Sequence, residues 1–253
     1  MKRRLCRCVR VAGILFAFIA AIGPISSTTA GGRNEARVSQ AIHNVQLVAP
    51  NAKPRPASIN DYVRQGTAVR TDRYSRAELA FTDRTLARLG ANSLLSLGER
   101  EFDLANGSML LYLPKHSGGA RINTATATAA GSNFTVMAEY RPKSWTKFIV
   151  LEGNGSISLK HHPGETRALR AGQMMTVPQG AMKLPEPQGI DLSRLIRTSL
   201  LVTQFPPLPN LRMILSEAND QQIPPPTSRV IDPTGLNARD QRAATDRVRP
   251  SKP

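Results

Sequence analysis

Large side chains recur at every second position in AELAFT (77–82), SLLSL (93–97) and SMLLYL (108–113). This period of two is typical of half-buried strands, because successive side chains of a strand point to opposite faces. The same pattern continues to Val177, and residues such as Gly118, Gly119 and Gly164 interrupt it where tight turns need unusual backbone angles. We therefore predict an all-β fold of short strands. No reactive cluster accompanies the strands, which favours a binding surface over a catalytic pocket.

The first thirty residues have the pattern of an export signal. Basic residues from Lys2 to Arg10 precede an apolar run over 11–23, and small residues follow up to Ala30. At a helical rise of ~1.5 Å per residue the run spans about 20 Å, whereas a bilayer core needs roughly 30 Å. We expect cleavage after Ala30 and a periplasmic or extracellular location. An uncleaved membrane anchor is the alternative.

Cysteine content and charge restrict the chemistry further. Both cysteines, Cys6 and Cys8, lie in the leader, so we expect neither a disulfide nor a thiolate metal site after cleavage. Loss of five basic and no acidic leader residues lowers the formal charge from +16 to +11. Such a charge favours an acidic partner, for example an anionic wall polymer or a membrane surface. Nucleic acid is not expected, because stacking aromatic residues are scarce, with one Trp and four Tyr.

Composition divides the chain into five segments. Residues 1–30 are the signal peptide, and residues 31–60 are predicted to hold one strand over 41–48 and a Pro-rich connector. Residues 61–180 are the β domain. Residues 181–222 are Pro-rich and are expected to hold two short helices capped by Asp191 and Asn210, and residues 223–253 are expected to form a disordered basic tail. We expect the first helix to cap the open end of the β stack; docking on a partner is the alternative.

A series of motifs follows in order along the β region. They are GTAVRTD (66–72), SRAELAFTD (75–83), TLARLGANS (85–93), LANGSM (104–109), TATATAAGSNF (124–134), VLEG (150–153) and LRAGQ (169–173). Together they resemble the FecR-type domain of bacterial envelope proteins. The matching positions are Gly66, Asp83, Leu89, Gly107, Gly131, Ser132, Phe134, Gly153 and Gly172.

The resemblance implies strands in stacked turns, like a small β-solenoid, although a β-sandwich would give similar spacing. The best-known members pass a signal from an outer-membrane transporter to a sigma factor through a cytoplasmic helical domain. The extracytoplasmic module is the part that this sequence resembles, without that anti-sigma region. Two positions depart from the family, Ser132 in place of threonine and Arg84 in place of glycine. Arg84 predicts either a turn without a positive backbone angle or strain of about 1 kcal/mol.

Trp145 is the main candidate for a partner contact. It is expected in a turn between two strands and is flanked by Arg141, Lys143 and Lys147, a combination that suits an anchor for a partner or an anionic headgroup. We favour partial burial at the rim of the domain over an exposed anchor.

Other candidate sites favour structural roles. His161 and His162 are adjacent, so in a strand they point to opposite faces, and with Glu165 they do not predict a metal site. Ser132 precedes a predicted strand instead of the helix that a nucleophilic serine requires, and Phe134 is expected in the core. The threonines of TATAT (124–128) are expected in a crowded inner row, with a sugar-binding ladder as the alternative.

The sequence therefore predicts a non-enzymatic exported module that binds or senses and contacts another envelope protein. No cofactor is expected. The alternative is a protein that binds the cell wall or a polysaccharide, which the basic charge also suits.

Overall fold

The alternating sequence folds into strands that lie in two layers. The structure is a computed structural model that describes residues 35–221, all of which fall in one contact unit. The strands are β1 (Glu35–Ile42), β2 (Val45–Val48), β3 (Arg55–Pro56), β4 (Tyr62–Arg64), β5 (Ala68–Thr71), β6 (Arg76–Phe81), β7 (Leu86–Leu89), β8 (Leu94–Leu97), β9 (Glu101–Leu113), β10 (Gly119–Asn123), β11 (Ala127–Ser132), β12 (Phe134–Arg141), β13 (Trp145–Glu152), β14 (Asn154–Leu159), β15 (Thr166–Arg170), β16 (Gln173–Pro178) and β17 (Gln188–Gly189). The all-β prediction is confirmed.

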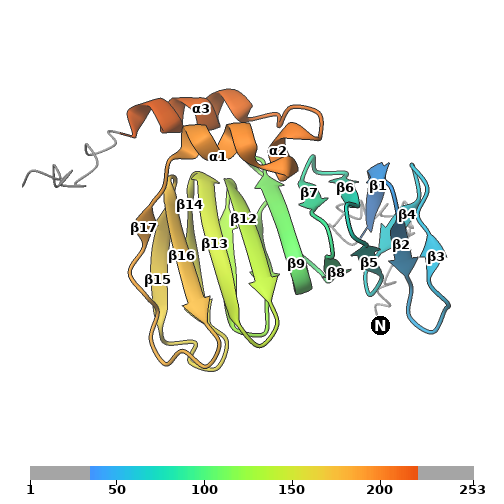
Figure 1. Ribbon diagram of the computed structural model, residues 1–253, viewed down its shortest axis with the longest axis horizontal. Helices are drawn as coiled ribbons and strands as arrows, with labels where there is room; N and C mark the ends of the chain where they lie inside the picture. Colours follow the sequence, from blue (N-terminus) through green and yellow to red (C-terminus); the bar gives the residue numbers. More distant parts are fainter. Residues whose placement is uncertain (1–34, 222–253) are drawn as a thin grey trace, which may run out of the picture. The chain divides into compact units, whose positions relative to one another are not determined.

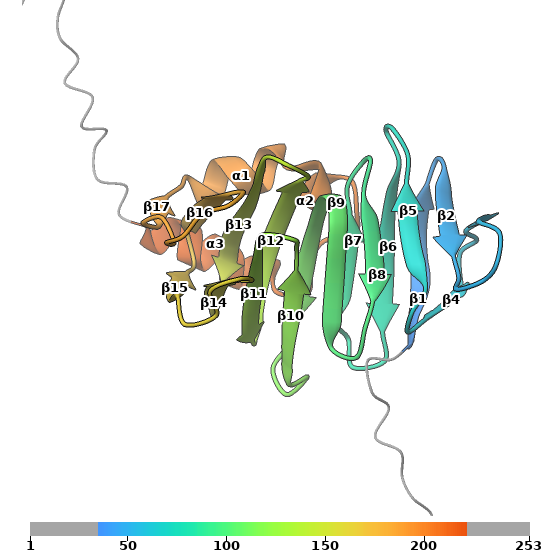
Figure 2. The same cartoon turned by 90° about the horizontal axis from the view of Figure 1, so that it is seen from below.

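Two sheets share the long strand β9. Sheet A has the order β4-β1-β6-β7-β9-β12-β13-β16-β17, and sheet B has the order β3-β2-β5-β8-β9-β10-β11-β14-β15. The two layers are visible in Figures 1 and 2, and neither sheet closes into a barrel. All neighbouring strands are antiparallel except β9 and β10. The strands thus stack as the solenoid-like prediction requires, but the chain doubles back instead of coiling in one direction.

Residues with positive φ carry the chain from one sheet to the other. Gly107 has φ 91° inside β9, whose first half pairs in sheet B and whose second half pairs in sheet A. Asn133 (φ 51°) separates β11 from β12, and Gly153 (φ 77°) separates β13 from β14. Glycine and asparagine adopt this conformation most readily. The Asn-Gly pair at 106–107 is therefore a corner within one strand and not a chain reversal.

The N-terminal segment differs from its prediction. The single strand expected over 41–48 is wrong, because the chain turns at His43 (φ 59°) and forms β1 in sheet A and β2 in sheet B. β1 pairs with β4 and β6, and β3, in the expected Pro-rich connector, pairs with β2. Residues 35–60 are therefore an integral part of the β structure.

The main core lies between the two sheets. Phe134 is 1% exposed, as predicted, and a Cβ at Gly131 or Gly155 would come within 3.1 Å of its ring. The expected inner row of threonines is confirmed only in part, because Thr124 and Thr126 are buried, 3% and 7% exposed, but do not belong to one strand row with Thr128. Ala127 and Ala129 of β11 face this core, whereas Thr124 and Thr126 precede the strand and Thr128 alternates with the alanines.

Three helices cover part of the outer face of sheet A. They are α1 (Leu192–Thr198), α2 (Leu200–Thr203) and α3 (Leu211–Asp220), where two had been predicted. Ile196, Leu201 and Ile214 belong to a second apolar cluster with Leu110 and Leu151 of the sheet. Figure 1 shows the helices beside β9, β12 and β13. The helices therefore cover a sheet face, and the prediction of a cap on the open end of the stack is wrong.

The two predicted helix caps have different outcomes. Asp191 caps α1 as predicted, because its Oδ1 accepts a hydrogen bond from Arg194 N at 2.8 Å. Asn210 precedes α3 but makes no side-chain cap. Its Nδ2 instead donates to Thr135 Oγ1 at 2.6 Å and to Glu152, and so ties the helix to β12 and β13. No helix within residues 35–221 is long and apolar enough to cross a membrane.

A buried arginine joins the helical segment to sheet A. Arg88 Nε donates to Glu78 Oε2 at 2.7 Å, and its Nη1 and Nη2 donate to the carbonyls of Leu201 and Pro206 at 3.1 and 2.5 Å. The ring of Phe205 lies 4.9 Å from the guanidinium carbon. Burial lowers the pKa of Arg88, and the Glu78 carboxylate opposes that shift. The Arg88–Glu78 pair therefore links β6 and β7 of sheet A to the helical segment that contains Leu201 and Pro206.

Gly107→Ala tests the corner in β9. A Cβ at this position would lie 2.5 Å from Ser93 Cα and 2.7 Å from Asn92 O, in addition to the strain of a positive φ. We expect a loss of about 3 kcal/mol in the free energy of unfolding, measured by denaturant titration. Gly164→Ala is the control, because a Cβ there would meet nothing within 4 Å. Equal stability of the two variants would contradict the role of the corner.

Arg88→Met tests the buried pair. The substitution leaves the Glu78 carboxylate buried without its cation, so we expect a loss of about 3–5 kcal/mol in unfolding free energy. In the double variant Arg88→Met with Glu78→Gln no charge stays unpaired, and the loss should be smaller. Chemical denaturation followed by circular dichroism measures both. A double variant as unstable as the single one would argue against this account.

Candidate functional site

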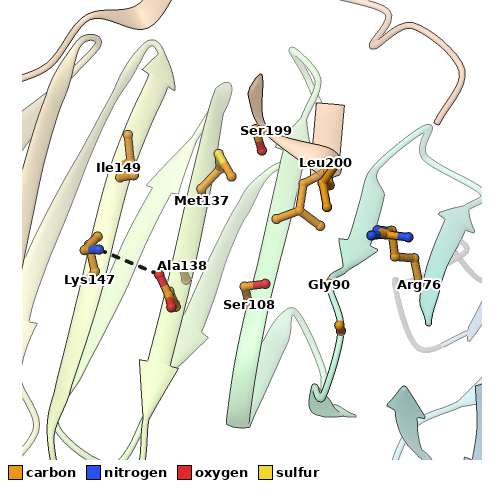
Figure 3. Close-up of a pocket in the computed structure, with 12 residues that line it drawn as sticks. Arg76, Gly90, Ser108, Met137, Ala138, Lys147, Ile149, Ser199 and Leu200 are labelled. Atoms are coloured by element: carbon orange, nitrogen blue, oxygen red, sulfur yellow. Dashed lines mark ion pairs between the residues drawn. The ribbon is translucent and has the colours of Figure 1, made fainter. Parts of the chain in front are cut away.

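A hollow of about 260 Å³ lies on the outer face of sheet A, next to the junction of α1 and α2. Its lining comes from β6, β9, β12 and β13 and from the helical segment, and Figure 3 shows the labelled side chains around it. The side chains that define its character are Arg76, Ser108, Met137, Glu139, Lys147 and Leu200. This combination is amphipathic, with an apolar centre and charged ends.

Strand register sets the floor of the hollow. Ser108 of β9 is opposite Glu139 of β12, which is opposite Lys147 of β13, so the three form one row across sheet A. Two positions along each strand, Met137 and Ile149 form the next row, which packs against the helices. A Cβ at Gly90 would lie only 2.2 Å from Ser108 Oγ, so glycine at this position leaves the space open.

Charged side chains connect the hollow to the hairpin between β12 and β13. Glu139 pairs with Arg141 at 3.1 Å and with Lys147 at 3.7 Å. The Arg141 guanidinium carbon and Lys147 Nζ lie 5.2 and 4.5 Å from the centre of the Trp145 ring. Cations at these distances are attracted to an aromatic face. The structure therefore brings together three of the four residues that the sequence singled out.

The fourth residue, Lys143, lies in the turn of the same hairpin. It has φ 60° and is exposed, while Trp145 is half-buried at the start of β13. The predicted turn and the predicted partial burial of the tryptophan thus occur together. We call the hollow and this hairpin the sheet A surface, made of Arg76, Ser108, Met137, Glu139, Arg141, Lys143, Trp145, Lys147, Ile149 and Leu200.

Residues of the motif pattern form the scaffold instead of lining the hollow. Gly66, Gly107, Gly153 and Gly172 have positive φ, and Leu89 and Phe134 are buried in the core. Gly131 packs on the Phe134 ring, Ser132 is exposed at the end of β11, and the Asp83 carboxylate accepts from Thr85 N at 2.9 Å. Arg84 has a positive φ of 67°, so of the two predictions for this turn the one with backbone strain is confirmed.

The histidine pair lies at a separate place. His161 and His162 follow β14 and line a hollow of about 230 Å³ with Thr126 and Gln179. Glu165 is directed elsewhere, because its Oε1 accepts from Leu184 N at 3.1 Å. Within residues 35–221 there is no group of three His, Cys, Asp or Glu side chains that could hold a metal ion.

Sequence reasoning missed Arg76, Ser108, Met137 and Leu200. Alternation predicts that Ser108 and Met137 belong to strands, but only the pairing register places them in neighbouring rows. Arg76 and Leu200 reach the same hollow from β6 and from the helical segment, which are far apart in sequence. Local sequence patterns carry no signal for such a meeting.

The comparison with protein families agrees with the motif pattern. The FecR protein family model matches residues 67–156. Two crystal structures of a "putative anti-sigma factor" from Parabacteroides distasonis ATCC 8503 are similar, each with 9% sequence identity and a TM-score of 0.44. The likeness covers 52% of this chain and 65% or 64% of those chains, so this chain spans less than two thirds of their length. No match was found among curated proteins.

The matched residues run from the segment before β5 into β14, and so include the corners at Gly107, Asn133 and Gly153. The resemblance drawn from the motifs is thereby confirmed. Residues 67–156 therefore form a FecR domain.

Proposed function

We propose that this chain is a non-enzymatic exported module that binds or senses by contacting another bacterial envelope protein through the sheet A surface. The FecR domain supports a signalling or sensing role. The basic leader and the apolar run at 11–23 support export, with a periplasmic or extracellular location after cleavage at Ala30. Residues 1–34 lie outside the described residues, so export rests on the sequence.

The observation that carries the proposal is the surroundings of Trp145. Its half-buried ring is held in place by Arg141 and Lys147 and lies beside an amphipathic hollow. Tryptophan and arginine are enriched among the residues that contribute most to protein interfaces. A ring whose orientation is already fixed loses little freedom when a partner binds, which favours affinity.

The formal charge of +11 expected after cleavage favours a second candidate, an anionic wall polymer bound by the same basic surface. The two candidates differ in their response to salt. Binding to a polyanion through exposed cations weakens steeply as the ionic strength rises. Retention on purified wall material that is lost in salt would favour the polymer, and indifference to the wall would favour the protein partner.

Affinity capture from native cells tests the proposal. The full chain, tagged at its C-terminus so that the leader stays free, should recover one specific envelope protein. Trp145→Ala combined with Lys147→Ala should reduce recovery about tenfold or more, as expected for loss of an interface anchor. Tyr62→Ala is the matched control, because Tyr62 is 60% exposed on the edge strand β4. Thermal unfolding should confirm that all variants fold.

Repeated capture of no specific protein, or undiminished capture by the double variant, would count against the proposal.

A further inference from the structure

Arg76 is a buried cation without a carboxylate partner among residues 35–221. It is only 8% exposed, and its Nη1 donates to Tyr74 O at 3.3 Å. The other buried arginine of the described chain, Arg88, pairs with Glu78 at 2.7 Å. Burial of a charge is costly unless the charge is paired and hydrogen-bonded. The positive charge of Arg76 is therefore free to pair with a carboxylate from outside the described residues.

The guanidinium of Arg76 is directed toward the hollow. Figure 3 shows it at one end, facing Leu200, with Lys147 at the opposite end. Gly90 lies between Arg76 and Ser108 and adds no side chain that would block the approach. An anion that enters the hollow can therefore reach the guanidinium.

Charge and polarity in the hollow favour a negatively charged, apolar occupant. Among residues 35–221, Glu139 is the only acidic residue that lines it, and this carboxylate already pairs with Arg141 and Lys147. Between the charged ends the lining is apolar, from Met137, Ile149 and Leu200. The positive charge of Arg76 therefore remains to be matched, next to a surface that suits a bulky apolar group.

The volume of the hollow favours a peptide side chain over a large cofactor as its occupant. The hollow measures about 260 Å³, below the range of about 300–1,000 Å³ for small-molecule pockets. A space of this size accommodates one or two side chains. Two residues of its lining, Glu139 and Lys147, also belong to the hairpin that carries Trp145.

We propose that the hollow binds a short segment of the partner protein in which an Asp or Glu lies next to a bulky apolar residue. The carboxylate pairs with Arg76, and the apolar side chain packs on Met137, Ile149 and Leu200. This inference rests on the proposed function, since it gives the chemistry of the segment that the sheet A surface recognises.

Two peptides that differ in one charge test the proposal. The probes are an acetylated and amidated ALELA pentapeptide and its ALQLA counterpart, titrated into the isotope-labelled full chain and followed by NMR. We expect ALELA to bind about tenfold more tightly or better, because a charge-assisted hydrogen bond contributes about 1.5–3 kcal/mol. The shifts should involve Arg76, Ser108 and Leu200.

Variants assign the difference to Arg76. In Arg76→Gln the two peptides should bind equally weakly. Arg170→Gln removes one exposed cation from β15 in sheet B and should preserve the preference for ALELA. Leu200→Ser shortens an apolar side chain that is 49% exposed and should weaken both peptides.

Thermal unfolding distinguishes ligand recognition from a structural role. Because the buried charge is unpaired in the free protein, Arg76→Gln should leave the melting temperature unchanged or raise it. A marked fall would show that Arg76 stabilises the fold and would overturn the inference.

Equal affinity for the two peptides, binding of neither, or a preference that survives in Arg76→Gln would also overturn the inference. None of these results would affect capture of a partner that depends on Trp145, so the two proposals fail separately.

Discussion

The whole architecture depends on backbone corners with positive φ. They occur in touching pairs on neighbouring strands. A Cβ at Gly107 would lie 2.7 Å from the carbonyl oxygen of Asn92, and a Cβ at Gly153 would lie 2.6 Å from that of Asn133. Both asparagines also have positive φ, 52° and 51°. In each pair the glycine is required, because a Cβ there would collide with the backbone of the asparagine corner. The asparagine position has room for a side chain. Repetition of this arrangement folds antiparallel ribbons over into two stacked sheets.

The stacked sheets leave an outer face that the chain itself covers only in part. Arg88 and Asn210 fix the helical segment over one region, where Leu110 and Leu151 are buried. The helices end beside the row of Ser108, Glu139 and Lys147, so the edge of the cover becomes a wall of the hollow. The same helical segment thus stabilises the domain and shapes its candidate recognition surface. For this reason the buried Arg88–Glu78 pair, which anchors the helical segment, lies close to the hollow.

Local signals in the sequence predicted much of the fold. Alternation predicted the strands, Gly118 and Gly164 predicted turns between strands, and Asp191 predicted the start of α1. The errors arose where the deciding contact is distant. The sequence around His43 gives no signal for its positive φ. Asn210 donates hydrogen bonds to side chains of β12 and β13 instead of capping its own helix. The cluster around Trp145 was predictable because one hairpin carries it, whereas Arg76 required the pairing of many strands.

Site-specific photo-crosslinking in native cells tests most directly whether the sheet A surface is the recognition surface. A photoreactive amino acid is placed at Lys143 or Leu200 on the sheet A side, and at Arg121 or Ser156 of β10 and β14 in sheet B. The account predicts covalent adducts with one envelope protein from Lys143 and Leu200 and none from Arg121 and Ser156. Adducts confined to Arg121 and Ser156, or none from any position, would contradict it.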